Sequence, residues 1–125
     1  MEIVIIERSI ILSERLAELL IDSFENTVFH FVHNYKEFYS YLKKNPRPDL
    51  ILIDNDIYEE YPDETPAILR QTKGSDTCVI VLYNNVVSTL TSDIIKKQGA
   101  DYVIDLYPEF ENIPLFIQEY YQKRG

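Results

Sequence analysis

The stretch that decides the fold is PDLILIDND, residues 48–56. Four apolar residues, 50–53, lead directly to Asp54, and Asn55 and Asp56 follow it. A short apolar run between polar residues is typical of a strand that is buried on both faces of a sheet. Asp54 is then either a functional carboxylate at the end of that strand or a turn-forming residue that ends it.

The same pattern recurs along the chain. Strands are predicted over residues 2–6, 27–33, 49–54, 77–83 and 101–105. Amphipathic helices are predicted over residues 9–24, 35–44, 65–73, 87–100 and 109–123, the last of them interrupted or started at Pro114, and an acidic loop is predicted directly after Asp54. Strands that alternate with helices predict an α/β fold, a doubly wound sandwich with a five-stranded parallel sheet. The 125 residues suit a single domain, 1–125.

Composition narrows the class of function. The net charge is −9 and the sequence pI is about 4.6. We expect neither nucleic acid nor an anionic membrane surface as a partner, because both require clustered Lys and Arg. No apolar run approaches the roughly 20 residues of a membrane helix. The one cysteine, Cys78, lies in an apolar run and is interpreted as a buried structural thiol, which suits a cytoplasmic location.

Polar residues follow each predicted strand, where a parallel sheet binds its ligands. They are Glu7 and Arg8, His33 and Asn34, Asp54 to Asp56, Tyr83 and Asn84, and Asp105 with Leu106. Acids end three of the five strands, so a carboxylate cluster around a hard cation is one interpretation, and ordinary turn formation is the other. The first strand is followed by ERSIILSE, which has no glycine and therefore argues against a phosphate-cradling loop for a nucleotide or flavin.

Four segments carry a resemblance to a known family: IVIIERSIILSERLAELL at 3–20, PDLILIDNDI at 48–57, TCVIVLY at 77–83 and KKQGADYVI at 96–104. Together they resemble the receiver domain of bacterial two-component response regulators over nearly the whole chain. The resemblance implies the flavodoxin-like (βα)5 fold and a role in phosphorelay signal transduction. It also implies that Asp54 is the phosphoacceptor, to which a histidine kinase transfers a phosphoryl group.

The resemblance further implies a Mg²⁺ site, for which Glu7, Asp54 and Asp56 are the candidate ligands. The second acid that this family places after the first strand is replaced by Arg8. We hypothesise that the Arg8 guanidinium takes the place of the metal by pairing with Asp54 and keeping it ionised. Mg²⁺ is therefore a doubtful cofactor, and no other cofactor is expected.

Three more positions depart from the family pattern. Tyr83 stands at the Ser/Thr position, Asp105 (or Leu106) stands at the Lys position, and Tyr58 replaces a proline. Losing groups that neutralise charge on a transferring phosphoryl lowers the rate of transfer strongly. The sequence therefore predicts a degenerate or pseudo-receiver that is not an enzyme and acts by protein–protein contact. The alternative is a functional phosphoacceptor, which would at most accept a phosphoryl group on Asp54.

A less favoured hypothesis is a small-ligand sensor on the same fold, supported by Tyr58, Tyr61, Tyr83 and Tyr107 near the site. The expected partner is a signalling protein. By the resemblance, the contact face is formed by helix 87–100, strand 101–105 and helix 109–123, and a homodimer through this face is possible. Its residues are Thr89, Asp93, Lys96, Lys97, Tyr102, Phe110, Phe116, Tyr120 and Tyr121, some of which must belong to the core.

Overall fold

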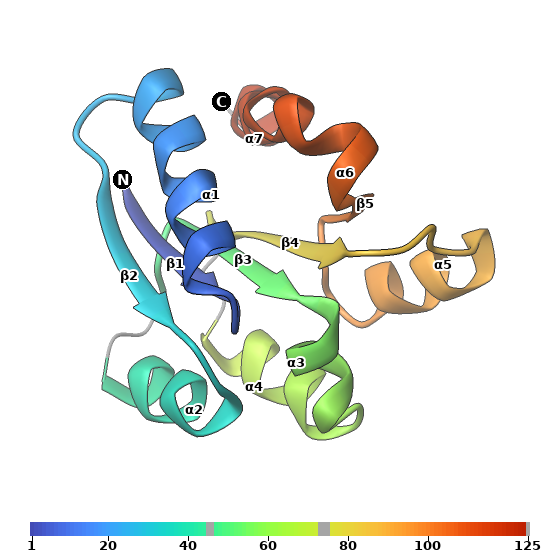
Figure 1. Ribbon diagram of the computed structural model, residues 1–125. Helices are drawn as coiled ribbons and strands as arrows, with labels where there is room; N and C mark the ends of the chain where they lie inside the picture. Colours follow the sequence, from blue (N-terminus) through green and yellow to red (C-terminus); the bar gives the residue numbers. More distant parts are fainter. Residues whose placement is uncertain (45–46, 73–75, 125) are drawn as a thin grey trace.

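The computed structural model describes residues 1–44, 47–72 and 76–124 (Figure 1). Within them one sheet contains β1 (Glu2–Ile6), β2 (Val28–Val32), β3 (Leu50–Asp54), β4 (Cys78–Tyr83) and β5 (Tyr102–Asp105). All neighbouring strands are parallel and their order is β2-β1-β3-β4-β5. The predicted five-stranded, doubly wound α/β fold is confirmed.

Helices cover both faces of this sheet (Figure 1). They are α1 (Ile10–Ser23), α2 (Tyr35–Lys44), α3 (Asn55–Glu60), α4 (Glu64–Thr72), α5 (Thr89–Lys97), α6 (Leu106–Glu109), the 3₁₀ helix η1 (Phe110–Asn112) and α7 (Ile113–Arg124). Helices α1 and α7 pack on one face, and α2, α3, α4 and α5 pack on the other.

Strand β3 shows why the sheet needs helices on both sides. Leu50 and Leu52 belong to the core beneath α1 and α7, whereas Ile51 and Ile53 belong to the core of the opposite face. All four side chains are fully buried. Since burying such a side chain stabilises a fold by about 1.5–3 kcal/mol, β3 is a firmly held central strand. It fixes the position of the Asp54 backbone at its carboxyl end.

The chain that connects β4 to β5 follows local rules that the sequence predicts. The hydroxyl oxygen of Ser88 accepts a hydrogen bond from the Thr91 amide at 3.1 Å and caps α5. Gly99, the predicted stop, has φ +121°, a conformation that L side chains rarely adopt. The helix therefore begins and ends close to where the sequence places it.

The prediction of an acidic loop directly after Asp54 is wrong, because α3 begins at Asn55. Its side chains Ile57 and Tyr58 are buried against the sheet, and this burial outweighs the weak helical pattern of six residues. The last predicted helix is also divided, since η1 precedes α7 and Pro114 lies in the first turn of α7. Residue 73, the predicted end of an earlier helix, lies outside the described residues.

Two smaller expectations concern the core and the membrane. Cys78 is fully buried, as predicted. Across residues 1–44, 47–72 and 76–124, no helix is both long enough and apolar enough to span a bilayer.

Candidate functional site

Asp54 is the last residue of β3 and the N-cap of α3, so it lies at the carboxyl edge of the sheet. Its side chain is only 2% exposed and makes no capping hydrogen bond to α3. The Oδ1 atom is buried and has no hydrogen-bond partner in the described part of the chain. An unpartnered oxygen in such a place is costly, and it commonly marks a functional position or a missing partner.

The surroundings of Asp54 make its carboxylate hard to ionise. Burial, and then the negative charges of Glu7 and Asp56, raise the pKa of Asp54 from 3.8 to about 7. The Asp56 backbone amide and the Arg8 charge act in the opposite direction but do not balance these causes. The site therefore favours the protonated form of the Asp54 carboxyl more than water does.

Glu7 lies beside Asp54, just after β1, and is 5% exposed. Its Oε2 atom accepts a hydrogen bond from the Ser9 amide at 3.1 Å. Burial raises the pKa of Glu7 as well, although the Ser9 and Arg8 amides oppose this. Ser9 also caps α1 by accepting a hydrogen bond from the Leu12 amide at 3.1 Å. The turn between β1 and α1 thus fixes the Glu7 carboxyl close to Asp54.

A pocket of about 370 Å³ opens beside these two acids. Its lining residues come from the β1–α1 turn, α1, and the ends of β3, β4 and β5: Glu7, Arg8, Ser9, Ile11, Leu12, Arg15, Asp54, Asp56, Asn84 and Tyr107. Glu7, Asp54 and Asp56 therefore lie together at one edge of the sheet.

The predicted pairing of Arg8 with Asp54 is wrong. The Arg8 Nη2 atom lies 2.6 Å from Glu60 Oε2, at the end of α3, and the two side chains form an ion pair. Both partners are more than one-third exposed, so the pair adds little to stability. Arg8 does not keep Asp54 ionised, because burial and the neighbouring acids have the larger effect on its pKa.

Tyr83, at the Ser/Thr position, turns away from Asp54. Its hydroxyl donates a hydrogen bond to Glu59 Oε1 at 2.7 Å, and the ring packs in the core beneath α2–α5. Burial and this contact with Glu59 raise the pKa of Tyr83 above its ordinary value. The residue after it, Asn84, lines the Asp54 pocket instead.

Asp105, at the Lys position, forms a hydrogen bond to the backbone. Its Oδ1 atom accepts a hydrogen bond from the Val87 amide at 2.9 Å, just before α5. Leu106 is buried in the core beneath α1 and α7. Neither residue lines the Asp54 pocket, and neither supplies a positive charge there.

The residues present fit a divalent cation poorly. Within the described ranges, no three His, Cys, Asp or Glu side chains are arranged as a metal-binding group. The Arg8 charge also acts on both Glu7 and Asp54, at the position where a second acid would favour a metal. A fixed cation next to the carboxylates competes with a second, divalent one. Mg²⁺ binding by Glu7, Asp54 and Asp56 stays a prediction.

The sequence predicted Tyr107 near the site but did not predict Arg15 there. Arg15 lines the pocket from α1, and Tyr107 lines it from α6. Helical spacing gives a signal for Arg15, because it follows Ile11 and Leu12 by four and three residues on one face of α1.

The other tyrosines near the site have structural contacts. The hydroxyl of Tyr58 donates a hydrogen bond to Gln98 Oε1 at 2.7 Å, and burial raises the pKa of Tyr58 to about 12. The ring of Tyr61 lies 4.3 Å from that of Tyr35, measured between centroids. Tyr58 and Tyr83 are buried, and Tyr61 is exposed but does not line the pocket. Tyr107 is both exposed and part of the pocket lining.

Comparison with known proteins identifies the fold. No model of a protein family matches the chain, and no curated protein matches it. Among solved structures, the Francisella response regulator 1452 receiver domain has a TM-score of 0.78 at 16% identity, covering 99% of this chain and 98% of that one. A Burkholderia pseudomallei response regulator with a phosphorylated aspartic acid, calcium ion and citrate has a TM-score of 0.75 at 18% identity, covering 99% and 72%.

A third solved structure has a different description. A putative CpaE2 pilus assembly protein from Sinorhizobium meliloti has a TM-score of 0.76 at 16% identity, covering 96% of this chain and 99% of that one. At these identities the likeness concerns the fold and not the activity. The chain therefore has the flavodoxin-like fold of response regulator receiver domains.

Proposed function

We propose that this protein is an atypical receiver-like signalling domain that acts by protein–protein contact, without a phosphorylation switch at Asp54. The proposal rests on the contacts of the three residues that depart from the family pattern, because each of them binds another part of the fold. Arg8 pairs with Glu60, Tyr83 donates to Glu59, and Asp105 accepts from Val87. None of them is directed at the Asp54 carboxyl. We place this domain in the cytoplasm as part of the same proposal.

The electrostatics of the site support this reading. In-line phosphoryl transfer requires an ionised nucleophile and cations that neutralise the equatorial oxygens. Asp54 instead has a pKa of about 7, raised by burial and by two neighbouring acids. The Arg8 guanidinium is already paired with Glu60. An incoming phosphoryl group would meet net negative charge, so we expect transfer to be slow.

The direct test is phosphorylation in solution. Wild-type protein and Asp54→Asn are incubated with acetyl phosphate and millimolar Mg²⁺, and their intact masses are measured. We expect no added phosphoryl mass on either protein. A phosphoryl adduct on the wild type that is absent from Asp54→Asn would contradict the proposal. A receiver domain of established phosphorylation, treated in parallel, verifies the reagent.

A second candidate function is phosphorylation of Asp54 by a histidine kinase. It is favoured by the position of Asp54 at the carboxyl end of β3, lining a pocket with an unpartnered Oδ1 atom. A carboxylate in this place has access to a small donor. The experiment above separates the two functions, because only this one predicts an adduct that depends on Asp54.

For the contact surface, we propose the face formed by α5, β5 and α7, used toward a signalling partner or a second copy of this chain. Part of the predicted face is core: the hydroxyls of Tyr120 and Tyr121 bind the backbone carbonyls of Thr77 and Asp49. Its exposed apolar residues include Leu115 on α7, and Leu90 and Ile94, which lie one turn apart on α5.

The homodimer is tested by sedimentation equilibrium of wild type and of the double variant Leu90→Glu, Ile94→Glu. If the face joins two copies, the wild type is a dimer and the variant is a monomer. A wild type that stays monomeric at high concentration rules out the homodimer and leaves a heterologous partner as the proposal. An equally dimeric variant would place the interface elsewhere.

A further inference from the structure

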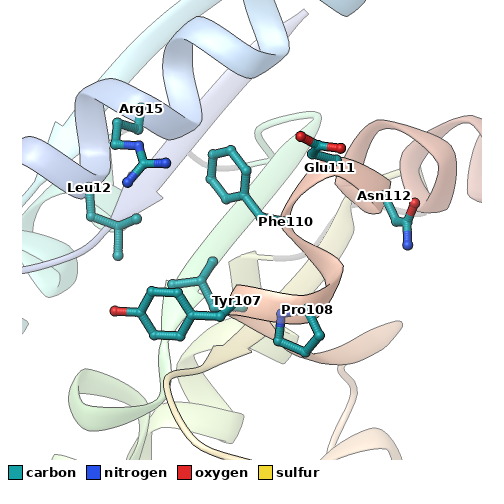
Figure 2. A pocket seen from close by; sticks show the side chains of 8 residues that line it. Leu12, Arg15, Tyr107, Pro108, Phe110, Glu111 and Asn112 are labelled. Carbon is teal, nitrogen blue, oxygen red and sulfur yellow. The ribbon is translucent and has the colours of Figure 1, made fainter.

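A second cavity lies between α1 and the α6–η1 segment, outside the Asp54 pocket (Figure 2). Its volume is about 510 Å³, within the range of small-molecule sites. The residues that give it its chemistry are Leu12, Arg15, Tyr107, Phe110, Glu111 and Asn112. Leu12, Arg15 and Tyr107 also line the Asp54 pocket, so the two cavities adjoin.

Arg15 provides the cation of this cavity. Its guanidinium carbon lies 5.5 Å from the centroid of the Phe110 ring, a cation–π contact that leaves the N–H groups available. Across the part of the chain that the structure describes, the Arg15 guanidinium makes no ion pair and no hydrogen bond. Glu111 lines the same cavity but forms no ion pair with Arg15. Figure 2 shows Arg15 and Phe110 extending into the gap from opposite sides.

The remaining wall is aromatic and apolar. Tyr107 is 73% exposed, and its ring extends toward the side of the cavity where Leu12 lies (Figure 2). An exposed ring next to an aliphatic side chain forms a surface against which a planar group can pack. The cavity thus combines one guanidinium that can fork onto an anion with an apolar surface of ring size.

Charge decides which anion fits. Glu111 lines the cavity, and Glu7, Asp54 and Asp56 line the adjoining pocket. The Arg15 guanidinium can pair directly with one carboxylate, whereas a second charge on a ligand would be repelled by these acids and by a chain of net charge −9. A monoanion with a planar carboxylate is therefore favoured over a phosphate or polyphosphate.

We propose that the cavity between α1 and α6–η1 binds a small aromatic monocarboxylate. The carboxylate pairs with the Arg15 guanidinium, and the ring lies against Tyr107 and Leu12. Binding at this site does not require phosphorylation of Asp54, so this proposal is independent of the proposed function. A ligand bound there would contact residues that also line the Asp54 pocket.

The test is a titration of the full chain with four probes, followed by ¹H–¹⁵N chemical shifts. Phenylacetate and indole-3-acetate carry the ring and the carboxylate, phenylacetamide lacks the charge, and phenyl phosphate carries a second charge. We expect saturable binding of both carboxylates, with the largest shifts at residues 12–15 and 106–112. The amide should not saturate, and phenyl phosphate should bind more weakly than phenylacetate.

Two matched variants locate the site. Arg15 and Arg47 are both exposed, and Arg47 lies at the opposite, amino-terminal end of β3. Arg15→Gln should weaken phenylacetate binding by at least about tenfold, because it removes a charge-assisted hydrogen bond. Arg47→Gln makes the same charge change and should alter binding by less than about twofold by that reasoning. Tyr107→Ala should also weaken binding.

The proposal is overturned by any of four results. Neither carboxylate shows saturable binding, phenylacetamide binds as tightly as phenylacetate, phenyl phosphate binds more tightly than phenylacetate, or Arg15→Gln binds phenylacetate as the wild type does. Because Arg15 and Tyr107 are exposed, neither substitution is expected to disturb folding. Unchanged backbone spectra of both variants verify this point.

Discussion

Asp54 is the residue at which burial and charge most oppose ionisation. Its folded-state pKa of about 7 is well above the ordinary value of 3.8. The folded chain therefore holds the Asp54 proton more tightly than the unfolded chain does. This favours folding at low pH, and the benefit is lost as the pH rises from about 4 through 7. Above pH 7 the fold carries an ionised, buried carboxylate.

The first prediction follows from that difference. Asp54→Asn should be close to the wild type in stability near pH 4 and more stable than the wild type at pH 8. One pKa unit corresponds to about 1.4 kcal/mol, so the gain is at most about 4 kcal/mol. Urea unfolding at several pH values measures it. The control, Asp93→Asn, removes an exposed carboxylate on α5 and should show no comparable pH dependence. A gain independent of pH would mean that the raised pKa is not the cause.

The second residue-scale prediction concerns position 8. Arg8→Asp supplies the second acid that a metal site of the receiver family has and removes a charge that lowers the pKa of Asp54. Without metal, this variant should melt at a lower temperature than the wild type. Millimolar Mg²⁺ should raise its melting temperature more than that of the wild type, by mass action. Arg47→Asp serves as the control for the charge change. An equal response of all three proteins would show that Arg8 is not what disfavours the metal.

At this scale the sequence predicted the place of Asp54 and missed the partner of Arg8. The apolar run 50–53 and the following acid are local signals, and they placed Asp54 at a strand end. Glu60 lies 52 residues from Arg8 in a segment that the sequence presented as loop. The orientation of Tyr83 had a usable signal, because it alternates with Val79 and Val81 toward the face opposite α1.

Helix α3 is the element on which the site contacts converge. It has six residues, and its N-cap, Asp54, provides no capping hydrogen bond. Such a short helix is unstable alone. Two part-buried side-chain hydrogen bonds to other elements hold it, Tyr83 to Glu59 and Tyr58 to Gln98, and the exposed Arg8–Glu60 pair adds little. The sequence could not predict this helix, because its order comes from contacts distant in the chain.

A substitution that removes the Tyr83–Glu59 contact tests whether it holds α3. Tyr83→Phe deletes the hydroxyl that donates to Glu59 and keeps the ring. We expect a loss of about 0.5–1.5 kcal/mol in unfolding free energy. We also expect faster hydrogen exchange in α3 than in the remaining helices. The control is Tyr39→Phe on α2, where the ring is 41% exposed. Unchanged exchange in α3 would show that the Tyr83–Glu59 bond does not hold the helix.

At the scale of the whole molecule, the alternation of strands and helices predicted the fold because it repeats over the full chain. Side chains on the two faces of each strand belong to two separate cores. Each core needs its own layer of helices to cover it. This regularity depends on many residues, so no single misread segment changes it. The site depends on a few long-range pairs, and one misread segment was enough to misplace Arg8.

The last prediction concerns the stability that side chains packed in these two cores provide. Ile80, in β4, is fully buried, whereas Ile94, on α5, is 48% exposed. Ile80→Ala should lower the unfolding free energy by about 2–5 kcal/mol, because it leaves a cavity between close-packed side chains. Ile94→Ala should cost less than about 1 kcal/mol by the usual scale of surface substitutions. Urea unfolding of both variants tests this, and equal losses would contradict the assignment of the core.

The contacts of α7 have a consequence for the order in which the protein folds during synthesis. The hydroxyls of Tyr120 and Tyr121 bind the carbonyls of Thr77 and Asp49, just before β4 and β3 begin. The Tyr120 ring also belongs to the core beneath α1 and α7. Until α7 has been synthesised, this face of the sheet has only α1 to cover it, and the part beneath α7 stays exposed. Chaperones that bind apolar surfaces would meet this face during translation and lose it once α7 docks.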